Sequence, residues 1–159
     1  MKIIFILNGP NLNMLGTRQP SIYGYETLAD IEKACHRHAA VLDLMVDFRQ
    51  SNYEGELVSW IQEASHKASG LILNAGAYTH TSLAILDSLA LVKQPIIEVH
   101  LSNIHAREQF RHHSYVTHIA SGLITGFGAY GYRLALTAMI ELLLKIDIQI
   151  DFSSKDQIL

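Results

Sequence analysis

The stretch Ile3-Ile4-Phe5-Ile6-Leu7, which runs directly into Asn8-Gly9-Pro10-Asn11, decides the fold. A short, uninterrupted apolar run that ends at turn-forming residues predicts a strand buried on both faces. The run is far shorter than the roughly 20 residues that a membrane span requires. It also leads to no small-residue cleavage site, so we do not interpret it as a secretory signal.

Similar apolar runs recur along the chain and alternate with stretches of helical periodicity. The other predicted strands are residues 45–48, 71–73, 96–101 and 123–125. The predicted helices are residues 27–42, 54–68, 82–92 and 129–144. This alternation predicts an α/β fold, a flavodoxin-like doubly wound five-stranded parallel sheet with strand order 2-1-3-4-5.

The composition indicates one globular domain. The chain has 159 residues, of which 49% are hydrophobic and 17% are charged, so global disorder is not expected. The formal net charge of −3 argues against a general nucleic-acid binder. Cys35 is the single cysteine, which excludes an intrachain disulfide and favours a cytoplasmic location. We expect no membrane association.

Polar side chains follow three of the predicted strands at the point where each strand ends. Asn11 follows the first strand, Asn74 follows the third, and His100 and Ser102 end the fourth. In open parallel sheets, ligands bind at the carboxyl ends of the strands, near the switch in strand order. We therefore expect these side chains to meet in one crevice that suits a small, hydroxyl-rich ligand.

Glu98 and His100 lie two residues apart on a predicted strand, so their side chains share one face of the sheet. A carboxylate beside an imidazole orients the ring and makes it a usable acid or base near neutral pH. The alternative is a structural polar pair near the end of a strand.

The connection over residues 14–26 contains Arg18 and Tyr23 and lacks clear periodicity. Loops of this length often close over ligands. An arginine near a tyrosine hydroxyl favours the phenolate, which is a stronger base than the phenol. A surface loop with an incidental tyrosine is the alternative.

Two further residues have open interpretations. Asp87 follows His80 by seven residues and lies among apolar neighbours, so it belongs either to an exposed helix face or to a contact with another subunit. Arg111 follows the fourth strand and could bind a carboxylate through two parallel hydrogen bonds, or it could lie in a solvated basic turn.

A glycine pattern and the histidines raise the question of cofactors. The stretch Gly126-Phe127-Gly128-Ala129-Tyr130-Gly131 has the spacing of a dinucleotide-binding loop, and Asp151 follows at a suitable distance. Too little chain remains for a second nucleotide-binding half, so we prefer close packing of a strand on the last helix. The nine histidines show no metal-ligand spacing, and we expect neither a metal nor a cofactor.

Several longer motifs, taken in order, resemble type II 3-dehydroquinate dehydratases over nearly the whole chain. They are Asn8-Gly9-Pro10-Asn11-Leu12-Asn13, Gln50-Ser51-Asn52, the stretch LNAGAYTHTS at residues 73–82, Glu98-Val99-His100-Leu101-Ser102-Asn103, and Phe110-Arg111-His112-His113-Ser114. The resemblance implies a hydro-lyase that dehydrates 3-dehydroquinate to 3-dehydroshikimate by anti elimination through an enolate. It also implies the shikimate pathway of aromatic amino acid biosynthesis and a dodecamer built from four trimers.

The resemblance also implies roles for individual residues. It implies Tyr23 as the base, Arg18 as a stabiliser of the transition state, His100 as the acid with Glu98 beside it, and Asn11 as the holder of a water on the enolate oxygen. The implied substrate contacts are Asn74, His80, Leu101, Ser102, Arg111 and, from a neighbouring subunit, Asp87.

The chain departs from this family at its carboxyl end. Family members commonly end soon after the last helix, so we place the catalytic domain at residues 1–145 and an extension at residues 146–159. Its alternating apolar pattern predicts an added strand followed by a frayed tail, with a continued helix as the alternative.

Two other functions remain as alternatives for the chain, a nucleotide-binding module and a non-catalytic scaffold.

Overall fold

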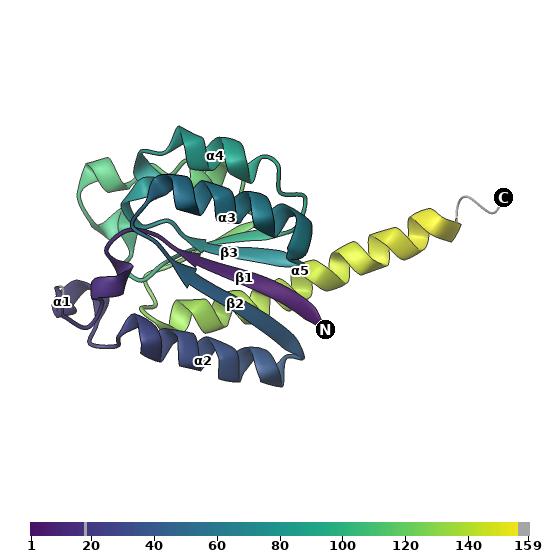
Figure 1. The fold of residues 1–159 in the computed structure, drawn as a ribbon, viewed down its shortest axis with the longest axis horizontal. Coiled ribbons are helices and arrows are strands. Elements are labelled where there is room, and N and C mark those ends of the chain that lie inside the picture. Colours follow the sequence, from purple (N-terminus) through teal and green to yellow (C-terminus); the bar gives the residue numbers. More distant parts are fainter. Residues whose placement is uncertain (18, 156–159) are drawn as a thin grey trace.

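The structure is a computed structural model that describes residues 1–17 and 19–155, and for residues 20 and 148–155 it describes the backbone only. A parallel sheet of five strands lies between two layers of helices (Figure 1). The strands are β1 (Lys2–Asn8), β2 (Leu44–Gln50), β3 (Gly70–Asn74), β4 (Ile96–His100) and β5 (Gly122–Thr125). The helices are α1 (Pro20–Tyr23), α2 (Leu28–Val41), α3 (Glu54–Lys67), α4 (Leu83–Leu89) and α5 (Tyr130–Lys155).

The strand order is β2-β1-β3-β4-β5, which confirms the predicted fold class and topology. From β1 the chain first forms β2 on one side and then β3 on the other, so the switch in strand order lies between β1 and β3. Asn8 pairs in register with Asn74 at the carboxyl ends of these two strands. This edge of the sheet is where parallel α/β folds bind ligands.

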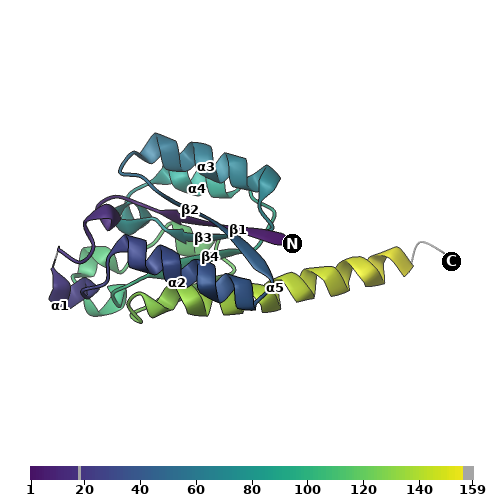
Figure 2. The same cartoon turned by 60° about the horizontal axis from the view of Figure 1, so that its bottom comes forward.

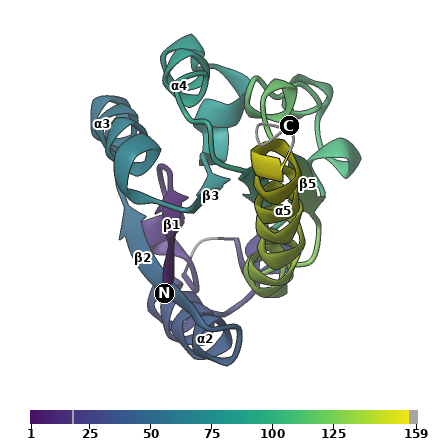
Figure 3. The same cartoon turned by 90° about the vertical axis from the view of Figure 1, so that its right-hand side faces the viewer.

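Each face of the sheet carries its own apolar core, and β1 contributes to both. Ile4 and Ile6 pack in the cluster that includes α2 and α5, whereas Phe5 and Leu7 pack in the cluster that includes α3 and α4. Figure 3 shows the two helix layers on either side of the sheet. Because both faces are covered, the strand is apolar at successive positions rather than at alternate ones.

Side chains cap the starts of α2 and α4. Thr27 accepts a hydrogen bond from the Asp30 backbone N–H at 3.2 Å, and the Asp30 carboxylate accepts one from the Thr27 N–H at 3.1 Å, so the two residues form a capping box at the start of α2. Ser82 caps α4 through the Ile85 N–H. The helix α4 ends at Leu89, earlier than predicted, because tighter three-residue turns replace the helical hydrogen bonds after it.

The predicted strand after residue 145 is wrong for residues 146–155, which continue α5 as a helix. Figures 1 and 2 show this end of α5 running clear of the sheet. A strand needs a neighbouring strand for its backbone hydrogen bonds, whereas a helix satisfies them internally. The tail expected at residues 156–159 lies outside the described residues. No helix in the described part of the chain is long and apolar enough to cross a membrane.

The glycine pattern before α5 serves packing, as predicted. A Cβ on Gly131 would lie 3.5 Å from Val99 and 3.6 Å from Ile124, so α5 begins directly against β4 and β5. Gly126 has a φ of 93°, and a Cβ there would lie 3.0 Å from the Asn103 Cβ. Only glycine adopts this backbone conformation at such close range without strain.

Candidate active site

A cavity of about 100 Å³ opens at the carboxyl ends of β1, β3 and β4. The sequence-predicted residues that line it are Asn11, Tyr23, Asn74, His80, His100, Leu101, Ser102 and Arg111. This confirms the prediction that one crevice would contain Asn11, Asn74, His100 and Ser102. The strand order brings them together, because it places β1, β3 and β4 side by side.

Glu98 and His100 form a hydrogen-bonded pair beneath this cavity. The His100 Nε2 lies 2.7 Å from the Glu98 Oε1, and the Glu98 side chain is fully buried. Three hydroxyl groups that sequence reasoning missed also donate to this carboxylate. They belong to Thr79 and Ser114, each at 2.7 Å, and to Thr117. The carboxylate is thus held rigidly by groups from three segments of the chain.

The pKa of Glu98 reflects two opposed effects. Burial raises it, but the hydrogen bond and the charge of His100, together with the Thr117 and Ser114 hydroxyls, outweigh burial and lower the pKa to about 2. Glu98 is therefore ionised and can only accept hydrogen bonds. It follows that the His100 Nε2 carries a proton, so Nδ1 is the nitrogen left for a ligand.

The lowered pKa predicts a dependence of stability on pH. The ordinary value of 4.5 applies to the unfolded chain, so the contribution of Glu98 is complete above pH 4.5 and is lost as the pH falls toward 2. We expect the wild-type free energy of unfolding to fall across this window by about 3 kcal/mol more than that of Glu98→Gln. Chemical denaturation at a series of pH values measures the difference. Identical pH dependence in the two proteins would contradict the assignment.

His80 supplies a second imidazole at the cavity wall. Its Nδ1 donates to the His113 carbonyl at 2.7 Å, which leaves Nε2 as an acceptor. Its ring stacks near that of His100, with 6.4 Å between centroids and 13° between planes. Partial burial lowers the pKa of His80 and favours the neutral ring. The two histidines therefore offer different hydrogen-bonding chemistry to one ligand.

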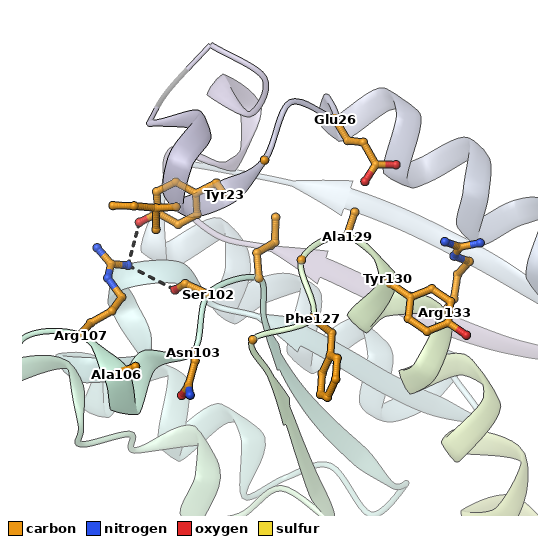
Figure 4. A pocket seen from close by; sticks show the side chains of 15 residues that line it. Tyr23, Glu26, Ser102, Asn103, Ala106, Arg107, Phe127, Ala129, Tyr130 and Arg133 are labelled. Atoms are coloured by element: carbon orange, nitrogen blue, oxygen red, sulfur yellow. Dashed lines mark hydrogen bonds between the residues drawn. The ribbon is translucent and has the colours of Figure 1, made fainter.

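Tyr23 meets an arginine that the sequence reasoning did not assign. The Arg107 Nη1 donates to the Tyr23 hydroxyl oxygen at 2.9 Å and lies 3.4 Å from the Ser102 Oγ (Figure 4). Sequence reasoning placed the tyrosine's guanidinium partner at Arg18, which lies outside the described residues. One signal could have identified Arg107: it shares the connection after β4 with Arg111, at the binding edge of the sheet.

Among the described residues, Arg107 and Arg111 each contribute a guanidinium group to the cavity wall. The exposed Glu108 carboxylate lies 3.0 Å from the Arg111 Nε and 3.6 Å from the Arg107 Nε. Two cations beside neutral hydrogen-bonding groups favour a small ligand with negative charge and hydroxyl groups.

Asn11 is held in place by its backbone rather than by its own side chain. It adopts a left-handed conformation with a φ of 67°, which asparagine tolerates better than most residues, and its N–H donates to the Asn52 Oδ1 at 2.9 Å. Gln50 and Tyr78 also contact this turn, through Gly9 and Asn52. The motif at residues 50–52 thus supports the cavity from outside.

Asp87 does not reach the cavity of its own chain. It lies exposed on α4, where Leu83 is also 56% exposed, and Leu91, which follows the helix, is 60% exposed. Leu83 and Asp87 are four residues apart, so they lie on one face of α4.

A second hollow, of about 480 Å³, adjoins the cavity (Figure 4). Tyr23, Leu101, Ser102 and Arg107 line both, so they form the wall between them. On its other side the hollow is bounded by the turn at residues 126–129 and by Tyr130 and Arg133 of α5. Movement of the α1 segment would therefore change the shape of both spaces.

The chain is similar to proteins of known family. Residues 1–140 match the family model described as Dehydroquinase class II. A protein of Brucella canis named 3-dehydroquinate dehydratase is 59% identical over 138 residues, which cover 87% of this chain and 88% of that protein.

Two solved structures share the fold. The type II dehydroquinase of Propionibacterium acnes superposes with a TM-score of 0.85 at 42% identity, covering 87% of this chain and 96% of that one. The type II dehydroquinase of Butyrivibrio crossotus DSM 2876 has a TM-score of 0.85 at 41% identity, covering 87% and 97%.

Proposed function

Because this chain belongs to the class II dehydroquinase family, we propose that it is a hydro-lyase that dehydrates 3-dehydroquinate to 3-dehydroshikimate. The observation that supports this most is the arrangement of Tyr23 with Arg107 and of His100 with Glu98 around one cavity. We further propose an anti elimination through an enolate, serving the shikimate pathway of aromatic amino acid biosynthesis.

The first step removes a proton from the carbon next to the ketone. Tyr23 takes the C2 proton as a phenolate, and the electron pair moves to the ketone oxygen to give the enolate. The Arg107 guanidinium donates to the Tyr23 oxygen and stabilises negative charge there. Arg18 is proposed as a further cation for this step. Asn11 holds a water on the enolate oxygen.

The second step expels the hydroxyl group at C1. His100 donates a proton to the departing oxygen, the enolate electrons form the new double bond, and water leaves. Glu98 stabilises the ring while it carries positive charge and fixes its orientation through Nε2. Neither step needs a redox cofactor or a metal ion, so we propose that the enzyme uses none.

The remaining cavity residues bind the substrate. We assign Asn74, His80, Leu101 and Ser102 to its oxygen atoms and Arg111 to its carboxylate, since a guanidinium binds a carboxylate through two parallel hydrogen bonds.

We propose residues 1–145 as the catalytic domain of a cytoplasmic enzyme that assembles as a dodecamer of four trimers. Asp87 on the exposed side of α4 then reaches the site of a neighbouring subunit.

The function is tested by adding 3-dehydroquinate, with a metal chelator present, and recording the absorbance of the conjugated enone. We expect turnover without metal or nucleotide. Saturable nucleotide binding without turnover would favour a nucleotide-binding module, and substrate binding without turnover would favour a scaffold.

Borohydride added with substrate tests the mechanism. We expect no inactivation, because no lysine of the described residues lines the cavity and a Schiff base needs one. Covalent trapping would contradict the proposed mechanism.

Replacing Arg107 with methionine is expected to lower kcat/KM by about a hundredfold. The substitution removes the hydrogen bond to Tyr23 and one cation from the cavity but keeps a long side chain. Steady-state kinetics measure the loss. Arg37→Met, at an exposed position on α2, is the matched control and should leave kcat/KM unchanged. Equal activity of the two variants would remove Arg107 from the site.

A further inference from the structure

Tyr132 is a fully buried side chain of α5 that lies between the ends of β1 and β3. Its hydroxyl donates to the Asn8 Oδ1 at 2.6 Å and accepts from the Asn74 Nδ2 at 2.8 Å. Asn8 and Asn74 are 0% and 2% exposed and face each other in the register of β1 and β3. Of these three residues, Asn74 lines the cavity.

Backbone groups at both ends fix the direction of the hydrogen bonds that join Asn8, Tyr132 and Asn74. The Asn8 Nδ2 donates to the Arg49 carbonyl at 2.9 Å, and a carbonyl can only accept. The Asn8 Oδ1 must therefore face Tyr132, and the single hydroxyl proton of Tyr132 goes to it. The Tyr132 oxygen is then left as an acceptor, so the NH₂ group of Asn74 must face it.

The hydrogen bond at Asn74, the other end of this series, requires the same direction. The Gly76 N–H donates to the Asn74 Oδ1 at 3.2 Å, and an N–H can only donate. Both ends therefore require the same orientation of the Asn74 carboxamide. One Nδ2 proton of Asn74 is used by Tyr132, and the other has no acceptor among the described residues.

We propose that Tyr132 is a positioning residue that fixes the Asn74 carboxamide as a hydrogen-bond donor toward the substrate. The inference rests on the proposed function and extends it, because it assigns an oxygen acceptor to the substrate group at Asn74. It also links substrate recognition to α5, a helix that contributes no side chain to the lining of this cavity among the described residues.

The test is Tyr132→Phe in the full chain, since phenylalanine keeps the ring and removes only the hydroxyl. The Asn74 NH₂ group then loses its fixed acceptor and the Asn8 Oδ1 loses its donor. We expect kcat/KM for 3-dehydroquinate to fall at least tenfold, mainly through a higher KM. A value within twofold of wild type would overturn the proposal.

A double-mutant cycle separates positioning from a general loss of structure. If Tyr132 acts through Asn74, adding Tyr132→Phe to Asn74→Ala should change kcat/KM less than twofold. Effects that multiply would overturn the proposal. If Asn74→Ala turns over too slowly, calorimetric binding of 3-dehydroshikimate to the same variants completes the cycle with the same criteria.

Ile31→Val is the matched control for stability, because Ile31 is buried in the same apolar cluster as Tyr132. It should lower the melting temperature and leave KM unchanged. A KM that rises equally in this control would overturn the proposal, because loss of stability alone would then explain the effect.

Failure of the proposed function is recognised separately, by absence of turnover in the wild-type protein. Crystal structures of wild type and Tyr132→Phe then provide a readout that needs no substrate. We expect the Asn74 carboxamide to shift or lose order in the variant, since the Gly76 N–H still holds its oxygen but its NH₂ group has lost Tyr132, and an unchanged, equally ordered carboxamide would overturn the positioning role.

Discussion

Replacing Tyr23 with phenylalanine is expected to lower kcat by about 10²–10⁴-fold, the range attributed to a positioned acid or base. Phenylalanine retains the ring that forms the wall between the cavity and the adjoining hollow. It removes the oxygen that accepts from Arg107 and, under the proposed mechanism, the atom that receives the C2 proton. Substrate affinity should therefore change only a few-fold, and the loss should fall on kcat.

Tyr25→Phe is the matched control for this experiment. It lies two residues further along the same segment and is 83% exposed, so the same chemical change there should leave turnover unchanged. Steady-state kinetics give kcat, and equilibrium binding of 3-dehydroshikimate gives affinity. Substantial turnover by Tyr23→Phe would assign proton removal to another group.

Replacing His100 with glutamine is expected to cause a loss of similar size, about 10²–10⁴-fold in kcat. The glutamine amide can occupy the place of Nε2 and keep a hydrogen bond to Glu98, so the buried carboxylate retains a partner. An amide cannot deliver a proton to a leaving hydroxyl group. The variant should therefore fold and bind substrate but fail to expel water.

His66→Gln, at an exposed position near the end of α3, controls for the chemical change. Exchange of the C2 proton with solvent deuterium separates the two steps. His100→Gln should still exchange it if enolate formation precedes loss of the hydroxyl. Wild-type turnover by His100→Gln would remove its role as the acid.

The sheet could be predicted from the sequence because each strand is coded locally. The apolar run at residues 3–7 and the capping pair Thr27 and Asp30 depend on neighbouring residues alone. Right-handed crossovers then leave few strand orders, and the order in turn places Asn11, Asn74 and His100 at one cavity. These predictions needed no knowledge of side-chain contacts.

Contacts between distant segments could not be predicted in the same way. Arg107 meets Tyr23 across 84 residues, and Thr79, Ser114 and Thr117 meet Glu98 from two different loops. Hydroxyl groups are common in loops, so nothing in the local pattern marks these three as partners of a buried carboxylate.

The prediction of a strand after residue 145 was wrong for another reason. Its period-two apolar pattern is typical of a strand, but a strand also requires a neighbour, and the pattern carries no information about one.

The cavity draws its groups from residues as far apart as Asn11 and Arg111, and Tyr132 adds support from the last helix. The cavity therefore forms only when segments that are distant in the sequence come together. A ligand that binds in this cavity therefore binds the folded chain and not the unfolded one. Such a ligand should slow proteolysis uniformly along the chain and raise the melting temperature in proportion to the logarithm of its concentration. Resistance to protease would thus measure the occupancy of the cavity as well as turnover does.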